Sequence, residues 1–197
     1  MSDRTLSVVP LFPLSTVLYP GGFLPLRVFE RRYLDMITRV MRDDARFGIV
    51  AIREGEEVGN AALPAEIGTI ARIIDFDQEH DGVLGIKVQG EQRFHIIDSA
   101  VQPDNLLTAS IRELAEAAPQ PLPPEQVRLA ELLANLWRKL KRPEQDLRLD
   151  DATWVAYRLA EMLPLPLDLK QKILESPLPT DKLGVLSRQV AGWAIKD

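Results

Sequence analysis

The stretch YPGGFLPLRVFERRY, residues Tyr19–Tyr33, places two prolines and a Gly-Gly pair inside an otherwise apolar run. Proline sets the first corner of a turn and glycine tolerates a positive φ at the second, so Pro20-Gly21-Gly22 predicts a turn. Apolar, strand-forming residues flank it in the ranges Val8–Tyr19 and Phe23–Val28. The stretch therefore predicts two strands that follow each other across a tight turn.

Both predicted strands contain prolines, Pro10 and Pro13 in the first and Pro25 in the second. Because proline donates no hydrogen bond to a β-ladder, it is found mostly on edge strands and at bulges. We therefore expect the first strand to be an edge or bent strand and not a central one. Kinked strands of this kind suit a small, strongly curved barrel better than a flat sheet.

After the second strand, the spacing of apolar residues changes from that of a strand to that of a helix. The apolar side of this segment consists of Phe29, Tyr33, Met36, Ile37, Val40 and Met41. The opposite, charged side consists of Glu30, Arg31, Arg32, Asp35 and Arg39. This pattern predicts an amphipathic helix of about three turns, long enough to plug the end of a barrel.

The strand pattern returns beyond this helix, with turns about every 8–12 residues, which is typical of a barrel or sandwich. The predicted strands are Phe47–Ile52, Ile67–Phe76, Leu84–Val88, Arg93–Ile97 and Leu106–Leu114. Gly90-Glu91 is predicted to be a turn between two of them. The strand Ile67–Phe76 is apolar on both faces, so we expect it to be central in the sheet.

The segment EAAPQPLPPE, residues 116–125, is rich in proline and predicts a connector between two domains. Four helices are predicted beyond it, namely Val127–Lys141, a helix capped by Asp150 or Asp151 that stops before Pro164, Leu169–Glu175 capped by Asp168, and a last helix capped by Thr180. The predicted fold class is α+β: a β pseudobarrel with an inserted helix in residues 1–115, then a small helical bundle in residues 126–197.

Composition excludes several kinds of site. The chain has no cysteine, which excludes disulfides, thiolate metal sites and cysteine nucleophiles. Its net charge of -5 opposes non-specific binding to nucleic acid or anionic lipid. No apolar run approaches the ~18 residues of a membrane helix, and the amino terminus has no apolar signal core. We expect a protein of the cytoplasm that has no contact with membranes.

The sequence contains no recognisable catalytic pattern. The motifs G-x-S-x-G, H-E-x-x-H and Gly-Lys are all absent, although spacing alone leaves a Ser–Lys dyad open. His95, in an alternating strand, is expected to be structural. A calcium loop beginning at Asp77 would need a glutamate where Val88 stands, so the residues around His80 predict an acidic hairpin turn. We therefore expect no catalytic residue, no metal and no cofactor.

Several short motifs stand in an order that is more specific than any one of them. They are Leu11-Phe12-Pro13-Leu14, Val17-Leu18-Tyr19-Pro20-Gly21, Leu24-Pro25-Leu26, Phe29-Glu30-x-Arg32-Tyr33, Ile67-Gly68-Thr69-Ile70-Ala71 and Gly90-x-x-Arg93-Phe94. Together they resemble the amino-terminal domain of the ATP-dependent Lon protease, and Lys170–Glu175 resembles one of that family's helices. The resemblance covers nearly the whole chain. It implies a pseudobarrel related to the PUA RNA-binding domain, capped by helices, in a domain that recognises protein substrates.

The resemblance also implies what this chain does not do. The ATPase and Ser–Lys protease modules of the family have no counterpart in the 197 residues, so we expect a stand-alone substrate-binding domain and no enzyme. Cereblon carries a similar domain, but its zinc domain requires cysteines. The implied function is the binding of exposed, apolar peptide segments of unfolded proteins, alone or as an adaptor for a protease or chaperone.

Tyr19 and Phe23, which flank the Pro-Gly-Gly turn, are the candidate peptide contacts. A hydrophobic groove between the barrel and the bundle is the alternative contact surface. RNA binding is the alternative function, suggested by the PUA kinship. It requires a basic stripe, whereas 24 basic residues are scattered among 29 acidic ones, which makes nucleic acid an unfavoured partner.

Overall fold

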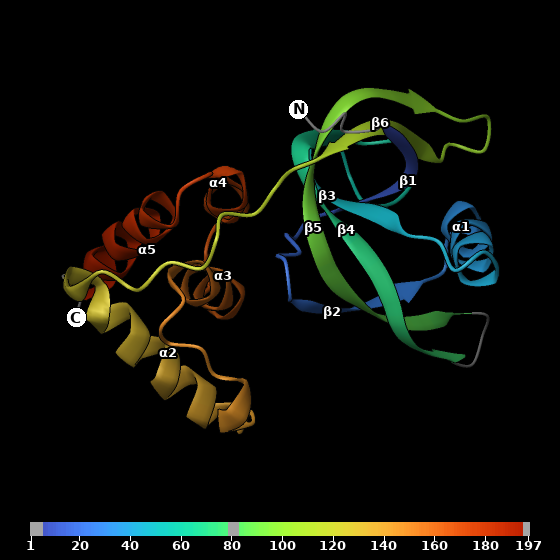
Figure 1. The fold of residues 1–197 in the computed structure, drawn as a ribbon. Helices are drawn as coiled ribbons and strands as arrows, with labels where there is room; N and C mark the ends of the chain where they lie inside the picture. Colours follow the sequence, from blue (N-terminus) through green and yellow to red (C-terminus); the bar gives the residue numbers. More distant parts are fainter. Residues whose placement is uncertain (1–5, 79–82, 195–197) are drawn as a thin grey trace. The chain divides into compact units, whose positions relative to one another are not determined.

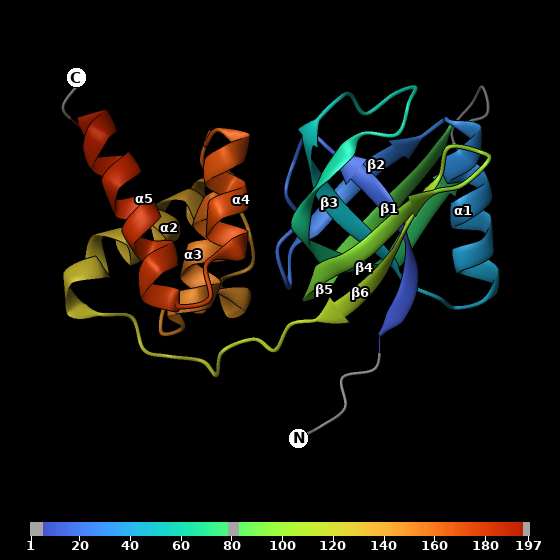
Figure 2. The same ribbon diagram turned by 90° about the horizontal axis from the view of Figure 1, so that it is seen from above.

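The protein divides into two compact units, Met1–Ala115 and Glu116–Asp197. The structure is a computed structural model that describes residues 6–78 and 83–194. Within the described ranges, the first unit contains six strands and helix α1, and the second contains helices α2 to α5. Figure 1 and Figure 2 show the two units in perpendicular views.

The strands of the first unit form one mixed sheet in the order β2-β5-β4-β3-β1-β6, and a further pairing of β5 with β6 curls it into a barrel. The strands are β1 Ser7–Leu14, β2 Phe23–Val28, β3 Phe47–Glu54, β4 Leu63–Gln78, β5 Leu84–Val101 and β6 Leu107–Glu113. The pair β1–β3 is parallel and the other pairs are antiparallel. The predicted α+β fold with a pseudobarrel and an inserted helix is confirmed, and β4 is central, as expected.

The Pro-Gly-Gly turn forms as predicted. The Gly22 amide donates to the Tyr19 carbonyl over 2.9 Å, and Gly21 has a φ of +70°. A proline followed by a glycine with positive φ is the signature of a type II turn. The turn is also fastened to β5, because the Gly21 amide donates to the Gly90 carbonyl and the Gly90 amide donates to Gly22.

The prediction that the first strand lies at an edge is wrong, because β1 has a partner strand on each side. Residues Ser7–Leu11 pair with β6, and residues Leu11–Leu14 pair with β3. Pro10 lies in the first part and Pro13 in the second, so each proline has a ladder on one side only. The edge strand is β2, for which β5 is the only partner strand among residues 6–78 and 83–194.

The turn predicted at Gly90-Glu91 is also wrong, because β5 runs through these residues without a break. Residues Glu91 and Gln92 lie opposite the single β4 residue Ile70, which is the arrangement of a β-bulge. A Cβ atom on Gly90 would lie 2.3 Å from the carbonyl oxygen of Tyr19. Glycine is therefore required there by the close approach of another backbone segment, and not by a change of chain direction.

Helix α1, Arg31–Arg42, packs against the barrel through the buried side chains of Tyr33, Met36, Ile37 and Val40. Its side of the core also contains Phe12, Leu14, Leu18, Val28, Phe47, Ile49, Ala71, Ile86, Val88 and Leu106. Two residues of the predicted apolar stripe are exposed instead, because Phe29 precedes the helix and Met41 lies near its end. Arg32, predicted on the charged side, is buried.

The second unit consists of α2 Val127–Lys139, α3 Ala152–Met162, α4 Leu167–Glu175 and α5 Pro179–Ala194. Asp151 caps α3 as predicted, since its carboxylate accepts from the amides of Thr153 and Trp154. The predicted caps Asp168 and Thr180 are wrong, because α4 and α5 begin two residues earlier than predicted, at Leu167 and Pro179, and place both residues in the first turn.

Two further expectations concern the whole chain. None of the helices in the described ranges is both long and apolar enough to cross a membrane. The acidic hairpin turn predicted around His80 lies outside the described residues.

Candidate functional site

The structure separates the two candidate peptide contacts. Phe23 is 51% exposed, whereas Tyr19 is completely buried beneath the turn and offers no surface to a partner. The ammonium group of Lys87 lies 5.2 Å from the centre of the Phe23 ring, on the exposed side of the β2–β5 pair. Phe23 therefore stays a candidate contact, and Tyr19 belongs to the core.

A larger surface, which the sequence did not reveal, lies beside α1. We call it groove A: a hollow of about 690 Å³ between α1, the start of β1 and the turn that joins β5 to β6. Its apolar lining consists of Val8, Pro10, Met36, Val40, Ala45 and Leu106. Its charged lining consists of Arg39, Asp43, Arg46 and Asp104.

A second hollow, groove B, lies between the carboxyl end of α1 and β4 and has a volume of about 230 Å³. Its apolar lining consists of Val40, Met41, Ala45, Ile73, Ile74 and Phe76. Figure 1 shows α1 at the side of the barrel, between the β5–β6 turn and the far end of the β4–β5 pair. The two grooves thus lie on either side of the carboxyl end of α1 and share Val40 and Ala45.

Both grooves carry apolar side chains that water can reach. Val8 in groove A is 73% exposed, and Ile74 and Phe76 in groove B are 42% and 60% exposed. Phe76 is exposed because β3 pairs with β4 only as far as Ala71. Beyond that point, β5 is the only strand in the described part of the chain that pairs with β4. Large apolar residues gathered at hollows of a surface are a mark of interaction sites.

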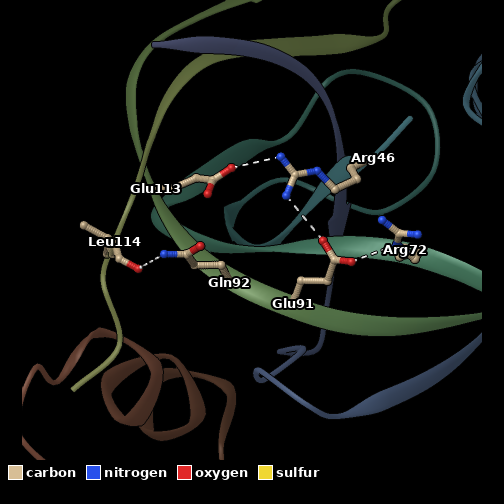
Figure 3. Close-up of polar contacts among 6 residues, drawn as sticks. All are labelled: Arg46, Arg72, Glu91, Gln92, Glu113 and Leu114. Atoms are coloured by element: carbon tan, nitrogen blue, oxygen red, sulfur yellow. Dashed lines mark hydrogen bonds and ion pairs between the residues drawn. The ribbon is translucent and has the colours of Figure 1, made fainter. Parts of the chain in front are cut away.

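A chain of ion pairs fixes the charged groups beside the grooves (Figure 3). Arg46 lies 3.0 Å from the Glu113 carboxylate and 3.3 Å from that of Glu91. Glu91 also pairs with Arg72, over 2.8 Å. The neighbouring bulge residue, Gln92, donates its side-chain amide to the Leu114 carbonyl. These contacts join the residue before β3, the middle of β4 and of β5, and the end of β6. They also neutralise the guanidinium groups of Arg46, in groove A, and Arg72, in groove B.

Buried charges in the first unit serve the fold. The guanidinium group of Arg32 is 6% exposed, donates to the Asn105 carbonyl over 2.9 Å and lies 3.1 Å from the Glu30 carboxylate. It therefore fastens the β5–β6 turn, one wall of groove A, to the start of α1. Burial, partly offset by Arg32, raises the pKa of Tyr33 above its usual range.

The helical unit contains a second set of buried charges. Arg158 lies 2.9 Å from Glu161 on α3, and burial raises the pKa of Glu161 to about 7 despite the opposing effect of Arg158. Lys182 is buried, donates to the carbonyls of Ile173 and Ser176 at the end of α4, and lies 4.9 Å from the Tyr157 ring centre. Lys182 thus supplies donors to a helix end, as basic side chains commonly do.

The described residues include no group of three or more histidine, aspartate or glutamate side chains that could hold a metal ion. His95, on β5, lies 3.8 Å from the Glu66 carboxylate and is partly exposed. Its surroundings are those of a surface strand residue. The features that set this protein apart are its apolar hollows and their charged rims.

Comparison with known proteins shows to which family this chain belongs. The substrate-binding domain of the ATP-dependent protease La (LON) matches residues 8–190. Lon protease 2 of Myxococcus xanthus is 29% identical over 184 residues, which cover 86% of this chain and 22% of that protease. Protein cereblon of Gallus gallus is 30% identical over 121 residues, which cover 58% of this chain and 25% of cereblon. The chain spans about a fifth of the length of the Lon proteases it matches, 22% and 21% for two of them.

Solved structures agree with this assignment. A crystal structure of a Lon N-terminal domain protein from Xanthomonas campestris is 35% identical, with a TM-score of 0.78, and the match covers 95% of this chain and 98% of that one. The N-terminal domain of the Mycobacterium avium complex Lon protease, 23% identical with a TM-score of 0.65, shares the fold over 91% of this chain and 96% of its own. The resemblance predicted from the ordered motifs is confirmed. The chain belongs to the family of Lon protease substrate-binding domains.

Proposed function

We propose that this chain is a non-catalytic substrate-recognition module that binds exposed apolar segments of unfolded proteins. Groove A carries the proposal, since this hollow of about 690 Å³ has an apolar lining that includes Val8, which is 73% exposed. A partner that covers such surface gains roughly 25 cal/mol for each Å² of apolar area removed from water. Membership of a substrate-binding family supports the same function.

Phe23 is the second contact that we propose. It is 51% exposed beside the Pro-Gly-Gly turn, on the edge strand β2. Aromatic side chains contribute strongly to binding because they bury a large area with few rotatable bonds. A partner that carries the bound segment to a protease or a chaperone would make the module an adaptor.

RNA binding, the alternative, finds less support in the charges beside the grooves. Nucleic acid is bound through uncompensated lysine and arginine side chains, each of which replaces counterions on a phosphate. Arg46 and Arg72 are instead paired with Glu91 and Glu113. The surface around groove A therefore favours an apolar polypeptide over a polyphosphate.

The proposal is tested with an unfolded model protein, reduced and carboxymethylated lactalbumin, titrated against the full chain in a calorimeter. We expect binding of the unfolded form and none of the native form, with a negative heat-capacity change as the sign of apolar burial. Equal heats for the native and unfolded forms would refute the proposal. A Phe23→Ser variant tests the second contact, and we expect it to bind about threefold to tenfold more weakly, as the loss of a partly buried apolar side chain implies.

A further inference from the structure

Grooves A and B form two halves of one surface. Both are lined by Val40, from the last turn of α1, and by Ala45, from the segment that follows it. The wall between them is therefore the carboxyl end of a single helix. A helix with its side chains is about 10 Å across, which an extended chain spans with about three or four residues.

The rim of this double surface is acidic once the ion pairs are taken into account. Arg46 and Arg72 pair with Glu91 and Glu113, and Asp43 pairs with Arg42 over 2.8 Å. Four charged residues that line the grooves have no ion-pair partner in the described part of the chain. They are Arg39, Asp44, Asp75 and Asp104. Three carboxylates thus face one guanidinium group.

We propose that one extended polypeptide segment crosses the carboxyl end of α1, places an apolar side chain in each groove, and carries lysine or arginine residues beside them. This inference rests on the proposed function and specifies its substrate class. The apolar side chains would be about four residues apart, because residues on one side of an extended chain recur every second position. The basic residues would lie against the rim at Asp44 and Asp104.

The same charges distinguish this occupant from two others. A second copy of the chain would bring an equally acidic rim and a net charge of -5 to the contact, which opposes self-association through this surface. Nucleic acid would bring phosphates to the same carboxylates. An apolar segment with basic flanks is the partner whose charge and polarity both complement the surface.

The test uses two labelled peptides, each with two leucines four positions apart in a serine background. One carries lysines at both ends and the other carries glutamates. In fluorescence anisotropy at low ionic strength, we expect the lysine peptide to bind the full chain about tenfold more tightly, and the difference to vanish in about 1 M salt, where the Debye length is about 3 Å. Equal binding of the two peptides would overturn the inference.

Two charge variants test where on the surface the basic residues of the peptide bind. We expect the double variant Asp44→Asn, Asp104→Asn to bind the lysine peptide about threefold to tenfold more weakly, as the loss of two surface attractions implies. Asparagine tolerates the positive φ of 46° at position 44 and keeps an oxygen that can accept the Leu106 amide at position 104. Glu56→Gln removes a charge from an exposed loop outside both grooves and should leave binding unchanged. An equal loss in Glu56→Gln would contradict the proposed location.

Two aromatic residues of similar exposure test the apolar contact. Phe76 lines groove B and is 60% exposed, whereas Phe29 lies outside both grooves and is 57% exposed. Phe76→Ser should weaken binding of the lysine peptide about tenfold, on the scale of a lost apolar side chain, and Phe29→Ser should not. Equal effects of the two variants, or dimers of the wild-type chain that Phe76→Ser dissociates, would overturn the inference. The proposed function has its own test: it is wrong if the wild-type chain does not bind unfolded lactalbumin.

Discussion

Replacing Gly90 by alanine tests the contact that organises the Pro-Gly-Gly turn. The added Cβ would lie 2.3 Å from the carbonyl oxygen of Tyr19 and 3.0 Å from Cγ of Leu18. The backbone cannot retreat freely, because the Gly21 amide donates to Gly90 over 2.8 Å and the Gly90 amide donates to Gly22 over 2.9 Å. Relief of the clash therefore requires the loss of one or both hydrogen bonds.

The magnitude follows from these contacts. Each backbone hydrogen bond contributes about 1 kcal/mol, and overpacking of a filled site costs about 1–3 kcal/mol. We therefore expect Gly90→Ala to lower the free energy of unfolding by about 3 kcal/mol, the sum of one lost hydrogen bond and an overpacking cost of about 2 kcal/mol.

Gly21→Ala is the matched control. A Cβ there has no atom within 4 Å, so only the positive φ of 70° opposes alanine. A left-handed conformation costs a residue other than glycine about 1–2 kcal/mol. Both variants are measured by urea denaturation followed by far-UV circular dichroism. The reasoning is refuted if Gly90→Ala is no less stable than Gly21→Ala, since the close approach would then have no energetic effect.

Three further predictions concern buried charges and a helix cap. Because burial raises the pKa of Glu161 to about 7, well above its usual range, the folded protein binds the extra proton and should lose up to about 3 kcal/mol of stability as pH rises from about 5 to 8. Glu161→Gln should abolish that loss in urea denaturation at several pH values, and an unchanged slope would contradict the assignment. Arg32→Ala should lower the free energy of unfolding by about 3 kcal/mol, because it leaves the buried contacts to Asn105 and Glu30 unmet. Arg31, whose side chain is 90% exposed, should tolerate alanine at almost no cost, and equal costs would be inconsistent with this reasoning. Asp151→Ala should lower the thermal midpoint of the helical unit through a loss of about 1 kcal/mol, and an unaltered midpoint would show that the cap is dispensable.

Patterns in consecutive residues made much of the fold predictable, whereas the pairing of strands that are distant in sequence could not be predicted. The Pro-Gly-Gly turn depends on the conformational preferences of three consecutive residues, so its sequence was sufficient to predict it. The position of β1 depends on two partners distant in sequence. Its prolines, which cannot donate to a ladder, are accommodated by a change of partner at Leu11, so that each proline pairs on one side only. No pattern within the strand records that change.

The candidate site was harder to predict for a related reason. Strict alternation along β4 would place Phe76 on the face of Ile70 and Ile74. The register of β4 against β5 shifts between Ile73 and Asp75, however, so Phe76 pairs with Ile86 and lies on the face of Ile73, which pairs with Val88. The exposure of Phe76 depends on where β3 begins, at Phe47, which is the partner of Ala71. Tyr19 shows the converse error, since a residue next to a surface turn is buried by contacts from β5. Burial at both positions is decided by strands that are distant in sequence.

The bulge in β5 links the architecture of the barrel to the charge of the proposed site. Its close approach to the turn requires Gly90, and the extra residue that it introduces brings Glu91 within ion-pair distance of both Arg46 and Arg72. Without that carboxylate, the described linings of grooves A and B would hold an uncompensated guanidinium group, and their rim would be less acidic. The proposed preference for basic flanks therefore depends on the same backbone irregularity that holds the Pro-Gly-Gly turn in place. In this proposal, one extra residue in β5 affects both the fold and the class of substrate.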